Sequence, residues 1–292
     1  MRAAAAGLNY EGIFVYRRGG QMETIRIIHR VSDTGEQERL TSLNGAAREV
    51  LRDGRALTCI RADERAVLVD ESGRNGLLGN RLRQWDDRFF DHYRVSLGGA
   101  ERVAGRKTRE VRIDPADEFR YGLRLWLDEQ TGLLLKSSLL DGGGEPVEEM
   151  IFTSVQLPPT IPENALRPEV AGEGFERRLL ADADAAPTEA SQSDPSPWVF
   201  GWMPPGFAKS VYSRRPLAGS SRPVEHIVFT DGLAAFSVYL EELGPEWQPF
   251  EGGRQVAGLS AFGRRVGDHQ VTVLGDVPSE TVGRVARAIQ RR

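Results

Sequence analysis

Alternation of apolar and polar residues runs through much of this 292-residue sequence and limits the chain to mainly β structure. Over Tyr121–Asp128, tyrosine or leucine fills every second position, and glycine, arginine, tryptophan or aspartate fills the positions between. Ile25, Ile27, His29 and Val31 also lie at every second position and share one face. A period of two puts alternate side chains on opposite faces of a strand, so each of these segments has one face to bury.

Turn signals divide the first half of the chain into many such strands. Gly19-Gly20 and Asp53-Gly54 are dipeptides that tolerate the positive φ of a two-residue hairpin turn. We expect strands at Tyr10–Arg17, Met22–Val31, Arg48–Arg52, Arg55–Arg61, Ala66–Asp70, Lys107–Ile113, Tyr121–Asp128, Leu133–Leu140 and Val147–Leu157. Long strands joined by short turns predict one large, strongly curved antiparallel sheet.

One segment within this region has a helical period instead. Its large apolar residues recur at spacings of three and four, which predicts a helix with an aromatic stripe that covers the sheet. The stripe consists of Leu82, Trp85, Phe89, Phe90 and Tyr93. These side chains suit two roles: they either fill the core between helix and sheet, or line a cavity that holds an apolar ligand. The pattern by itself favours plain core.

A loop-like stretch separates this β-rich region from a second unit. Residues 181–197 are rich in alanine, aspartate, serine and proline and cannot bury enough apolar area to offset the entropy of ordering. We therefore expect a large domain over residues 1–162, a linker over 163–197 and a small domain over 198–292. The small domain should combine strands at Val224–Phe229, Leu233–Leu240 and Gln270–Leu274 with a helix from Ser279 that buries Val282, Val285, Ala286 and Ile289.

Several function classes find no support in the sequence. The net charge of −4 is too small to predict binding to nucleic acid, and no apolar run approaches the roughly 20 residues of a membrane span. The single cysteine, Cys59, rules out an internal disulfide. Neither the four widely spaced histidines nor the carboxylate pairs have the spacing of a metal site or a catalytic dyad, so we expect no enzyme, no metal and no cofactor.

Several short runs stand out along the chain: Trp202–Phe207, Phe229–Val238 and Val271–Pro278 in the second unit, and Gly45–Val50 in the first. Together they resemble the MucB/RseB family of periplasmic regulators of an envelope-stress sigma factor. The resemblance spans nearly the whole chain in the same order. It implies an α+β, mainly antiparallel fold: a large domain similar to the lipoprotein carriers LolA and LolB, with an unclosed β-barrel covered by helices, and a small α+β domain.

The resemblance also implies a function. A family member lies in the periplasm after removal of a leader, binds the periplasmic region of an anti-sigma factor of the RseA/MucA type, and shields it from proteolysis. An acylated molecule such as lipopolysaccharide or a mislocalised lipoprotein releases that partner, and dimers or larger assemblies are expected. A carrier of lipid or lipoprotein, like the LolA relatives, is the alternative; a second domain favours regulation.

Two sets of residues are candidates for these contacts. We hypothesise that acyl chains enter a cavity beside the aromatic stripe defined above. Arg214 and Arg215 offer bidentate donors to a phosphate or an acidic partner segment, although a solvated turn before Pro216 explains them equally well. Trp202 and Phe207 are candidate partner contacts, for which a place in the core of the small domain is the simpler reading.

Overall fold

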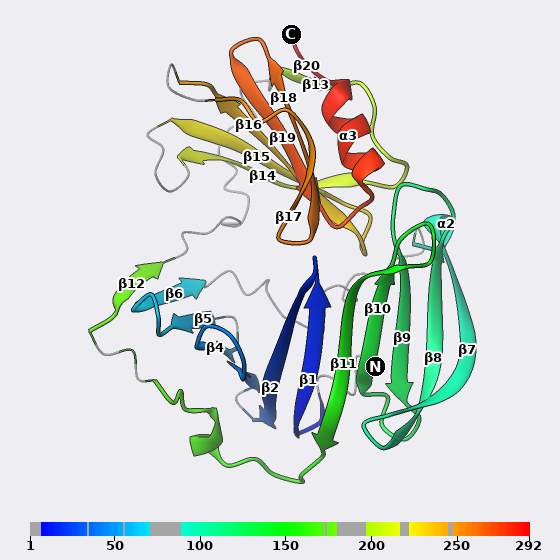
Figure 1. Cartoon of the computed structure of the whole chain (residues 1–292), viewed down its shortest axis with the longest axis vertical. Helices are drawn as coiled ribbons and strands as arrows, with labels where there is room; N and C mark the ends of the chain where they lie inside the picture. The colour runs from blue at the N-terminus through cyan, green and yellow to red at the C-terminus, as the bar shows by residue number, and fades with distance from the viewer. Residues whose placement is uncertain are drawn as a thin grey trace.

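A computed structural model of the chain describes residues 7–33, 35–54, 56–70, 89–170, 172, 174–179, 197–216, 222–244 and 248–292. Within this part, the strands form a twelve-stranded sheet, a six-stranded sheet and one short strand pair. The two large sheets lie one above the other in Figure 1, with the twelve-stranded sheet below.

The twelve-stranded sheet contains the first eleven described strands and one that follows them. They are β1 (Tyr10–Arg18), β2 (Gln21–Ser32), β3 (Gly35–Ser42), β4 (Arg48–Asp53), β5 (Ala56–Arg61), β6 (Ala66–Asp70), β7 (Tyr93–Val103), β8 (Arg106–Pro115), β9 (Gly122–Asp128), β10 (Leu134–Leu140), β11 (Pro146–Gln156) and β12 (Glu176–Leu179). Their order is β12-β6-β5-β4-β3-β2-β1-β11-β10-β9-β8-β7. Because β12 and β7 stand at opposite ends, the sheet is open, which confirms the predicted mainly antiparallel, unclosed architecture.

Hairpin chemistry sets the register of this sheet. Arg18 pairs with Gln21 across Gly19 and Gly20, whose φ values are 56° and 80°. Two consecutive residues with positive φ form the turn whose twist matches that of the flanking strands, so the hairpin predicted at this dipeptide is confirmed. Among the described strands of this sheet, only β12 departs from the antiparallel pattern, since it runs parallel to β6.

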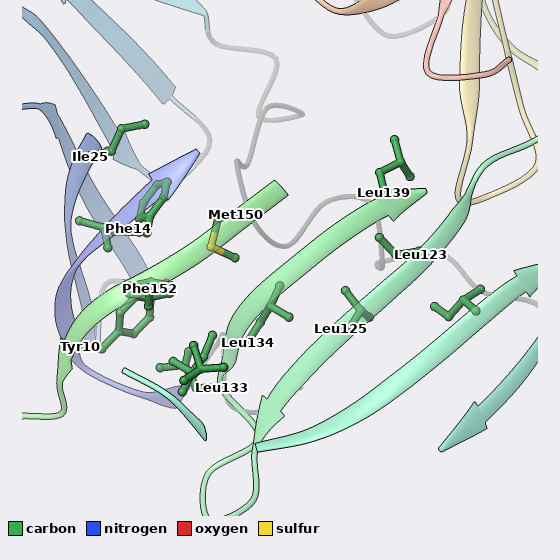
Figure 2. Close-up of a cluster of buried hydrophobic side chains, with 14 of the residues drawn as sticks. Tyr10, Phe14, Ile25, Leu123, Leu125, Leu133, Leu134, Leu139, Met150 and Phe152 are labelled. Atoms are coloured by element: carbon green, nitrogen blue, oxygen red, sulfur yellow. The ribbon is translucent and has the colours of Figure 1, made fainter. Parts of the chain in front are cut away.

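One face of the curved sheet carries the main hydrophobic core. Figure 2 shows Phe14, Phe152, Leu134 and Leu125 projecting from neighbouring strands towards the same side. The buried members of this cluster are Tyr10, Phe14, Ile25, Ile27, Leu40, Phe89, Tyr93, Val103, Ile113, Leu123, Leu125, Leu133, Leu134, Leu135, Leu139, Met150 and Phe152. Many of them alternate along a strand, as Met150 and Phe152 do, so the period-two pattern locates much of this core. Leu133, Leu134 and Leu135 are instead consecutive and all buried.

The small domain has a six-stranded antiparallel sheet with a helix on one face. Its strands are β14 (Ala208–Pro216), β15 (Pro223–Thr230), β16 (Ala235–Glu242), β17 (Gly252–Val256), β18 (Leu259–Val266) and β19 (His269–Gly275), in the order β14-β15-β16-β19-β18-β17. Helix α3 (Ser279–Ala288) packs on β18 and β19. Val282, Val285 and Ala286 are 0% exposed, so the predicted closing helix and these three residues of its inner stripe are confirmed. Ile289, the fourth predicted member, is also buried but begins β20. After α3, β20 (Ile289–Arg291) pairs with β13 (Trp198–Phe200).

The aromatic helix differs from its prediction at its C-terminal end. Among the described residues, α2 is a single turn over Phe89–His92, and Tyr93 is already the first residue of β7. Tyr93 pairs with Pro115 of β8, so the chain is already in the β-sheet at this residue, although the spacing of the apolar residues predicts a helix. Leu82 and Trp85 lie outside the described residues.

The segment after β11 lies against the large sheet. It contains the short 3₁₀ helix η2 (Glu163–Leu166) and then β12. The carboxylate of Glu49 on β4 accepts hydrogen bonds from the backbone N–H groups of Glu169 (3.0 Å) and Val170 (3.3 Å). Residues as far as β12 are thus attached to the large sheet, and the domain boundaries stay a prediction.

Candidate functional site

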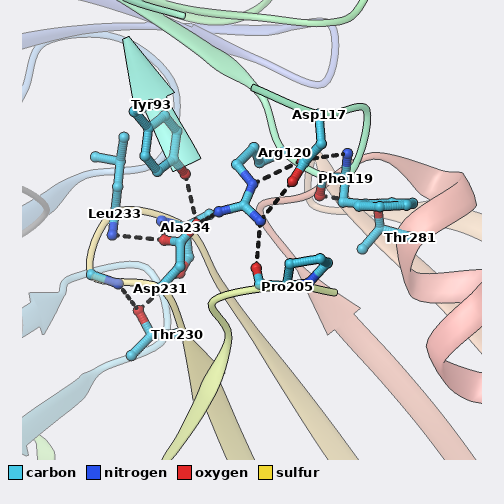
Figure 3. Close-up of polar contacts among 11 residues, drawn as sticks. Tyr93, Asp117, Phe119, Arg120, Pro205, Thr230, Asp231, Leu233, Ala234 and Thr281 are labelled. Carbon is cyan, nitrogen blue, oxygen red and sulfur yellow. Dashed lines mark hydrogen bonds and ion pairs between the residues drawn. The ribbon is translucent and has the colours of Figure 1, made fainter. Parts of the chain in front are cut away.

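Three loops from the two domains meet at one buried cluster. The loop of residues 116–121 joins β8 to β9 in the large sheet. It contacts residues 201–207, between β13 and β14, and the turn of residues 231–234, between β15 and β16. Figure 3 shows this meeting point, with Arg120 at its centre. We refer to Tyr93, Asp117, Arg120, Pro205, Phe207 and Asp231 as the junction cluster.

Arg120 makes hydrogen bonds to both domains. Its Nε and Nη2 donate to the two oxygens of Asp117, each at 3.0 Å, which fixes the guanidinium within its own loop. Its Nη1 donates to Oδ2 of Asp231 at 2.6 Å, and Nη2 also donates to the carbonyl oxygen of Pro205 at 2.6 Å. The side chains of Arg120 and Asp231 are both 0% exposed. Such a planar fork of donors makes arginine suited to a buried pairing of this kind.

Asp231 uses both of its oxygens fully. Oδ1 accepts hydrogen bonds from the backbone N–H groups of Leu233 (2.9 Å) and Ala234 (2.8 Å) in its own turn. Oδ2 accepts from Arg120 and from the hydroxyl of Tyr93, the latter at 2.8 Å. Burial, together with the adjacent Asp231 carboxylate, raises the pKa of Tyr93 far above its ordinary value. The tyrosine therefore remains a neutral hydrogen-bond donor at any physiological pH.

Aromatic rings enclose the guanidinium. Its central carbon lies 5.4 Å from the ring centre of Tyr93 and 5.2 Å from that of Phe207. Both distances are within the range of a cation–π contact. Beside the cluster, Phe119 packs edge-on against Trp202, with ring centres 5.1 Å apart, and Arg284 of α3 stacks over Trp202 at 4.0 Å.

Tight backbone approaches and a second ion pair extend the junction. Gly206 has a φ of 79°, a left-handed conformation that favours glycine, and a Cβ atom there would clash with the ring of His92. At the tip of the β1–β2 hairpin, Arg18 pairs with Glu148 at 2.8 Å and with Asp276 of the small domain. In Figure 1 this hairpin tip points towards β17 of the small domain.

The structure brings together members of both predicted residue sets. Tyr93, from the aromatic stripe, and Phe207, from the proposed partner contacts, both lie within cation–π distance of Arg120. Phe89 is buried and stacks on Tyr93 at 4.7 Å, whereas Phe90 is 63% exposed. The roles predicted for these residues stay predictions.

The remaining predicted residues lie apart from the cluster or at its edge. Trp202 is half-buried beside Phe119, next to the junction cluster. Arg214 is exposed on β14, opposite Glu225 of β15. The backbone of Arg215 pairs with Val224, and its side chain lies outside the described part.

Sequence reasoning missed the central residues, Arg120 and Asp231. In the sequence, Asp231 stands out only as part of a Thr-Asp-Gly turn, which explains its Oδ1 contacts and says nothing of Oδ2. Arg120 follows Phe119 in an ordinary polar loop. Their pairing joins positions 111 apart in the sequence, and a single sequence carries no local signal for it.

The junction cluster is suited to joining and orienting domains. All the hydrogen-bonding capacity of Asp231 is used by protein groups, and four donated bonds occupy Arg120. Among the described residues, histidine, cysteine and carboxylates form no cluster able to hold a metal ion. The same part of the chain has no helix long and apolar enough to cross a membrane.

Comparison with known proteins places both halves of the chain. The models of the MucB/RseB N-terminal domain and the MucB/RseB C-terminal domain match residues 1–170 and 192–290. The sigma factor AlgU regulatory protein MucB of Pseudomonas aeruginosa is 35% identical over 302 aligned residues, covering 97% of this chain and 86% of MucB.

Solved structures agree with this placement. The crystal structure of MucB in complex with MucA(peri) matches with a TM-score of 0.74 and 30% identity, over 100% of this chain and 96% of that chain. A crystal structure described simply as MucB matches with a TM-score of 0.64 at the same 30% identity, over 99% of this chain and 94% of that chain.

Proposed function

Because this chain belongs to the MucB/RseB family, as the resemblance in its sequence predicted, we propose that it binds the periplasmic region of a membrane anti-sigma factor. The observation that carries the proposal is the full-length likeness to MucB bound to MucA(peri). Binding of this kind covers the anti-sigma segment and protects it from proteolysis, which keeps the sigma factor inactive. The function places the chain in the periplasm, where such a segment is exposed.

The two-domain construction supports a regulator that grips a partner. The relatives found are regulatory proteins by name, and the junction cluster gives the domains a defined relative orientation. An extended segment that contacts both domains gains affinity from each, provided that their geometry allows simultaneous contact. We therefore expect both domains to contribute to partner affinity.

We further propose that an acylated molecule binds the apolar face of the large sheet and weakens partner binding. This face carries the buried cluster of Figure 2, and α2 lies at its β7 end. Phe90 on α2 is exposed and suits the entrance for an acyl chain. By linkage, a ligand that prefers the partner-free form lowers partner affinity by the same factor by which the partner lowers ligand affinity.

Calorimetric titration with a synthetic anti-sigma periplasmic peptide tests the partner. We expect saturable binding in buffer, and weaker binding once lipopolysaccharide is added. A lipid or lipoprotein carrier would bind the acylated molecule and ignore the peptide, so that result would favour the alternative function.

A matched pair of variants tests the acyl site. Phe90→Ser and Met22→Ser each remove a large exposed apolar side chain, 63% and 61% exposed respectively. Only Phe90→Ser should lose the response to lipopolysaccharide, because Met22 lies on β2, far from β7 in the strand order. An unchanged response in folded Phe90→Ser contradicts the assignment of this entrance.

We also propose that the free protein self-associates. Leu97 on β7 is 75% exposed and Val95 is 41% exposed, and β7 is an end strand of the large sheet. Exposed apolar side chains on an end strand favour contact with another chain. Sedimentation velocity of the free protein should show a dimer or larger species, and a monomer at all concentrations contradicts the proposal.

A further inference from the structure

The junction between the domains relies on buried charge. Arg120 and Asp231, one from each domain, are completely buried at the contact. Removing two charges from water costs nearly as much as their attraction returns, so a buried ion pair contributes little net stability. Separation of the domains would return both groups to water. A junction built in this way is therefore closer to balance between docked and separated states than an apolar one.

Tyr93 connects this junction to the apolar face of the large sheet. Its hydroxyl donates to Asp231 of the small domain, and its ring stacks on Phe89 of α2 at 4.7 Å with an angle of 17°. Phe89 belongs to the core cluster of the large sheet. A ligand that moved Phe89 would remove the stacking contact of the Tyr93 ring, whose hydroxyl supplies one of the two interdomain donors to Oδ2 of Asp231.

Taken over the whole chain, the structure resembles one form of MucB more than the other. The TM-score is 0.74 against MucB in complex with MucA(peri), and 0.64 against the structure described simply as MucB. Identity is 30% in both comparisons and coverage is nearly equal. The higher score belongs to the structure that contains a partner.

We propose that Arg120, Asp231 and Tyr93 form a releasable interdomain lock, which holds the domains in the partner-binding arrangement and opens when an apolar ligand displaces Phe89. The inference rests on the proposed function and adds a mechanism for it. Partner and apolar ligand each favour one of two domain arrangements, which is the requirement for coupling between distant sites. The lock supplies the element whose equilibrium both ligands shift.

Distance measurements test the lock without any partner. Spin labels are attached at Lys107→Cys and Glu280→Cys in the full chain with Cys59→Ser; these native side chains are 72% and 78% exposed. The otherwise unchanged chain should give one main interdomain distance. Asp231→Asn and the milder Tyr93→Phe should each add a second, broader population. An identical single distance in both variants overturns the lock.

A matched control distinguishes opening of the interdomain lock from the general effect of losing an ion pair. Arg106 binds Asp128 through two hydrogen bonds of 3.0 Å and 2.9 Å, and both residues belong to the large domain. Arg106→Gln should leave the interdomain distance unchanged, because its partner is in the same domain. A second population in this control as well would overturn the proposal, since domain separation would then follow from general destabilisation.

Peptide binding by the same variants tests the link to function. If Asp231→Asn leaves about one tenth of the molecules docked, its affinity for the anti-sigma peptide falls about tenfold, because only the docked fraction binds. Equal affinity in wild type and in folded Asp231→Asn overturns the lock and leaves the proposed function intact. Failure of the wild type to bind the peptide overturns the proposed function and, with it, the role of the lock in partner binding.

A ligand arm completes the test. Addition of lysophosphatidylcholine below its micelle concentration should add the second distance population to the wild type. Phe89→Leu keeps an apolar side chain but loses the ring stacked on Tyr93, and should weaken that response. A wild-type distance that ignores bound lysolipid overturns the release step.

Discussion

Replacement of Arg120 by methionine removes the only cation in the junction cluster. Arg120→Met deletes four hydrogen bonds and leaves the Asp231 carboxylate, 0% exposed, without its counter-charge. Loss of one partner from a buried ion pair costs about 3–5 kcal/mol. Asp231 keeps three other donors, and Asp117 is 19% exposed and can be hydrated. We therefore expect a loss near the lower end, about 3 kcal/mol.

Urea unfolding followed by tryptophan fluorescence measures this loss. Trp198 and Trp202 both lie in the small domain, and Trp202 packs against Phe119 beside the junction cluster. A two-domain chain need not unfold in one step, and the junction energy affects the domain that unfolds first. The first transition should therefore move to lower urea, while the second stays in place.

The double variant Arg120→Met with Asp231→Asn sharpens the test. The asparagine introduced by Asp231→Asn would retain an oxygen that accepts from the turn and would leave no orphan charge, so the double variant should be more stable than Arg120→Met alone. Arg17→Gln is the control, because the Arg17–Glu149 pair is 33% and 36% exposed and should contribute less than about 1 kcal/mol. A loss below about 1 kcal/mol in Arg120→Met, or strict additivity in the double variant, refutes the reasoning.

Three further outcomes follow from the structure. Phe152→Ala should cost about 3–5 kcal/mol in urea unfolding, since its side chain is 1% exposed in the main core; a loss under about 1 kcal/mol would mean that the site collapses freely. Burial alone would raise the pKa of Asp128, but hydrogen bonds from Arg106 and Thr131 outweigh it and lower the pKa. This carboxylate therefore stabilises the fold above its unfolded pKa of about 3.9, and the stabilisation is lost as pH falls through the lower folded pKa. Asp128→Asn should therefore make the unfolding free energy fall less steeply as the pH is lowered. An unaltered pH dependence contradicts this. Gly206→Ala should broaden the interdomain distance because its methyl group meets His92, and an unbroadened distance would show that His92 simply moves aside.

The sequence predicts the large sheet well because its signal is local. Tyr121–Asp128 alternates cleanly, and β9 occupies nearly the same residues, Gly122–Asp128. The small domain's closing helix is equally clear from Val282, Val285 and Ala286. Strands whose residues are mostly polar or exposed escaped notice, as β3 and β17 show. Backbone hydrogen bonds to the neighbouring strands hold them in the sheets, and the periodicity of side chains along the sequence does not indicate such bonds.

The candidate site was only half predictable for a related reason. Tyr93 and Phe207 were singled out as large aromatic residues in two separate contexts, and nothing in the sequence placed them on one guanidinium. The position of Tyr93 at a strand start depends on its pairing with Pro115, a tertiary contact that overrides the helical spacing before it. No sequence pattern marks Arg120 and Asp231, because they contact each other only when the two domains are docked.

The two oxygens of Asp231 contact different parts of the molecule, and this lowers the entropy that is lost when the domains dock. Oδ1 holds the β15–β16 turn through contacts within the small domain, whereas Oδ2 faces the other domain. The acceptor is thus already aimed before the domains meet, since its own turn keeps the carboxylate in place. Little conformational entropy of this side chain therefore remains to be lost when the two domains dock.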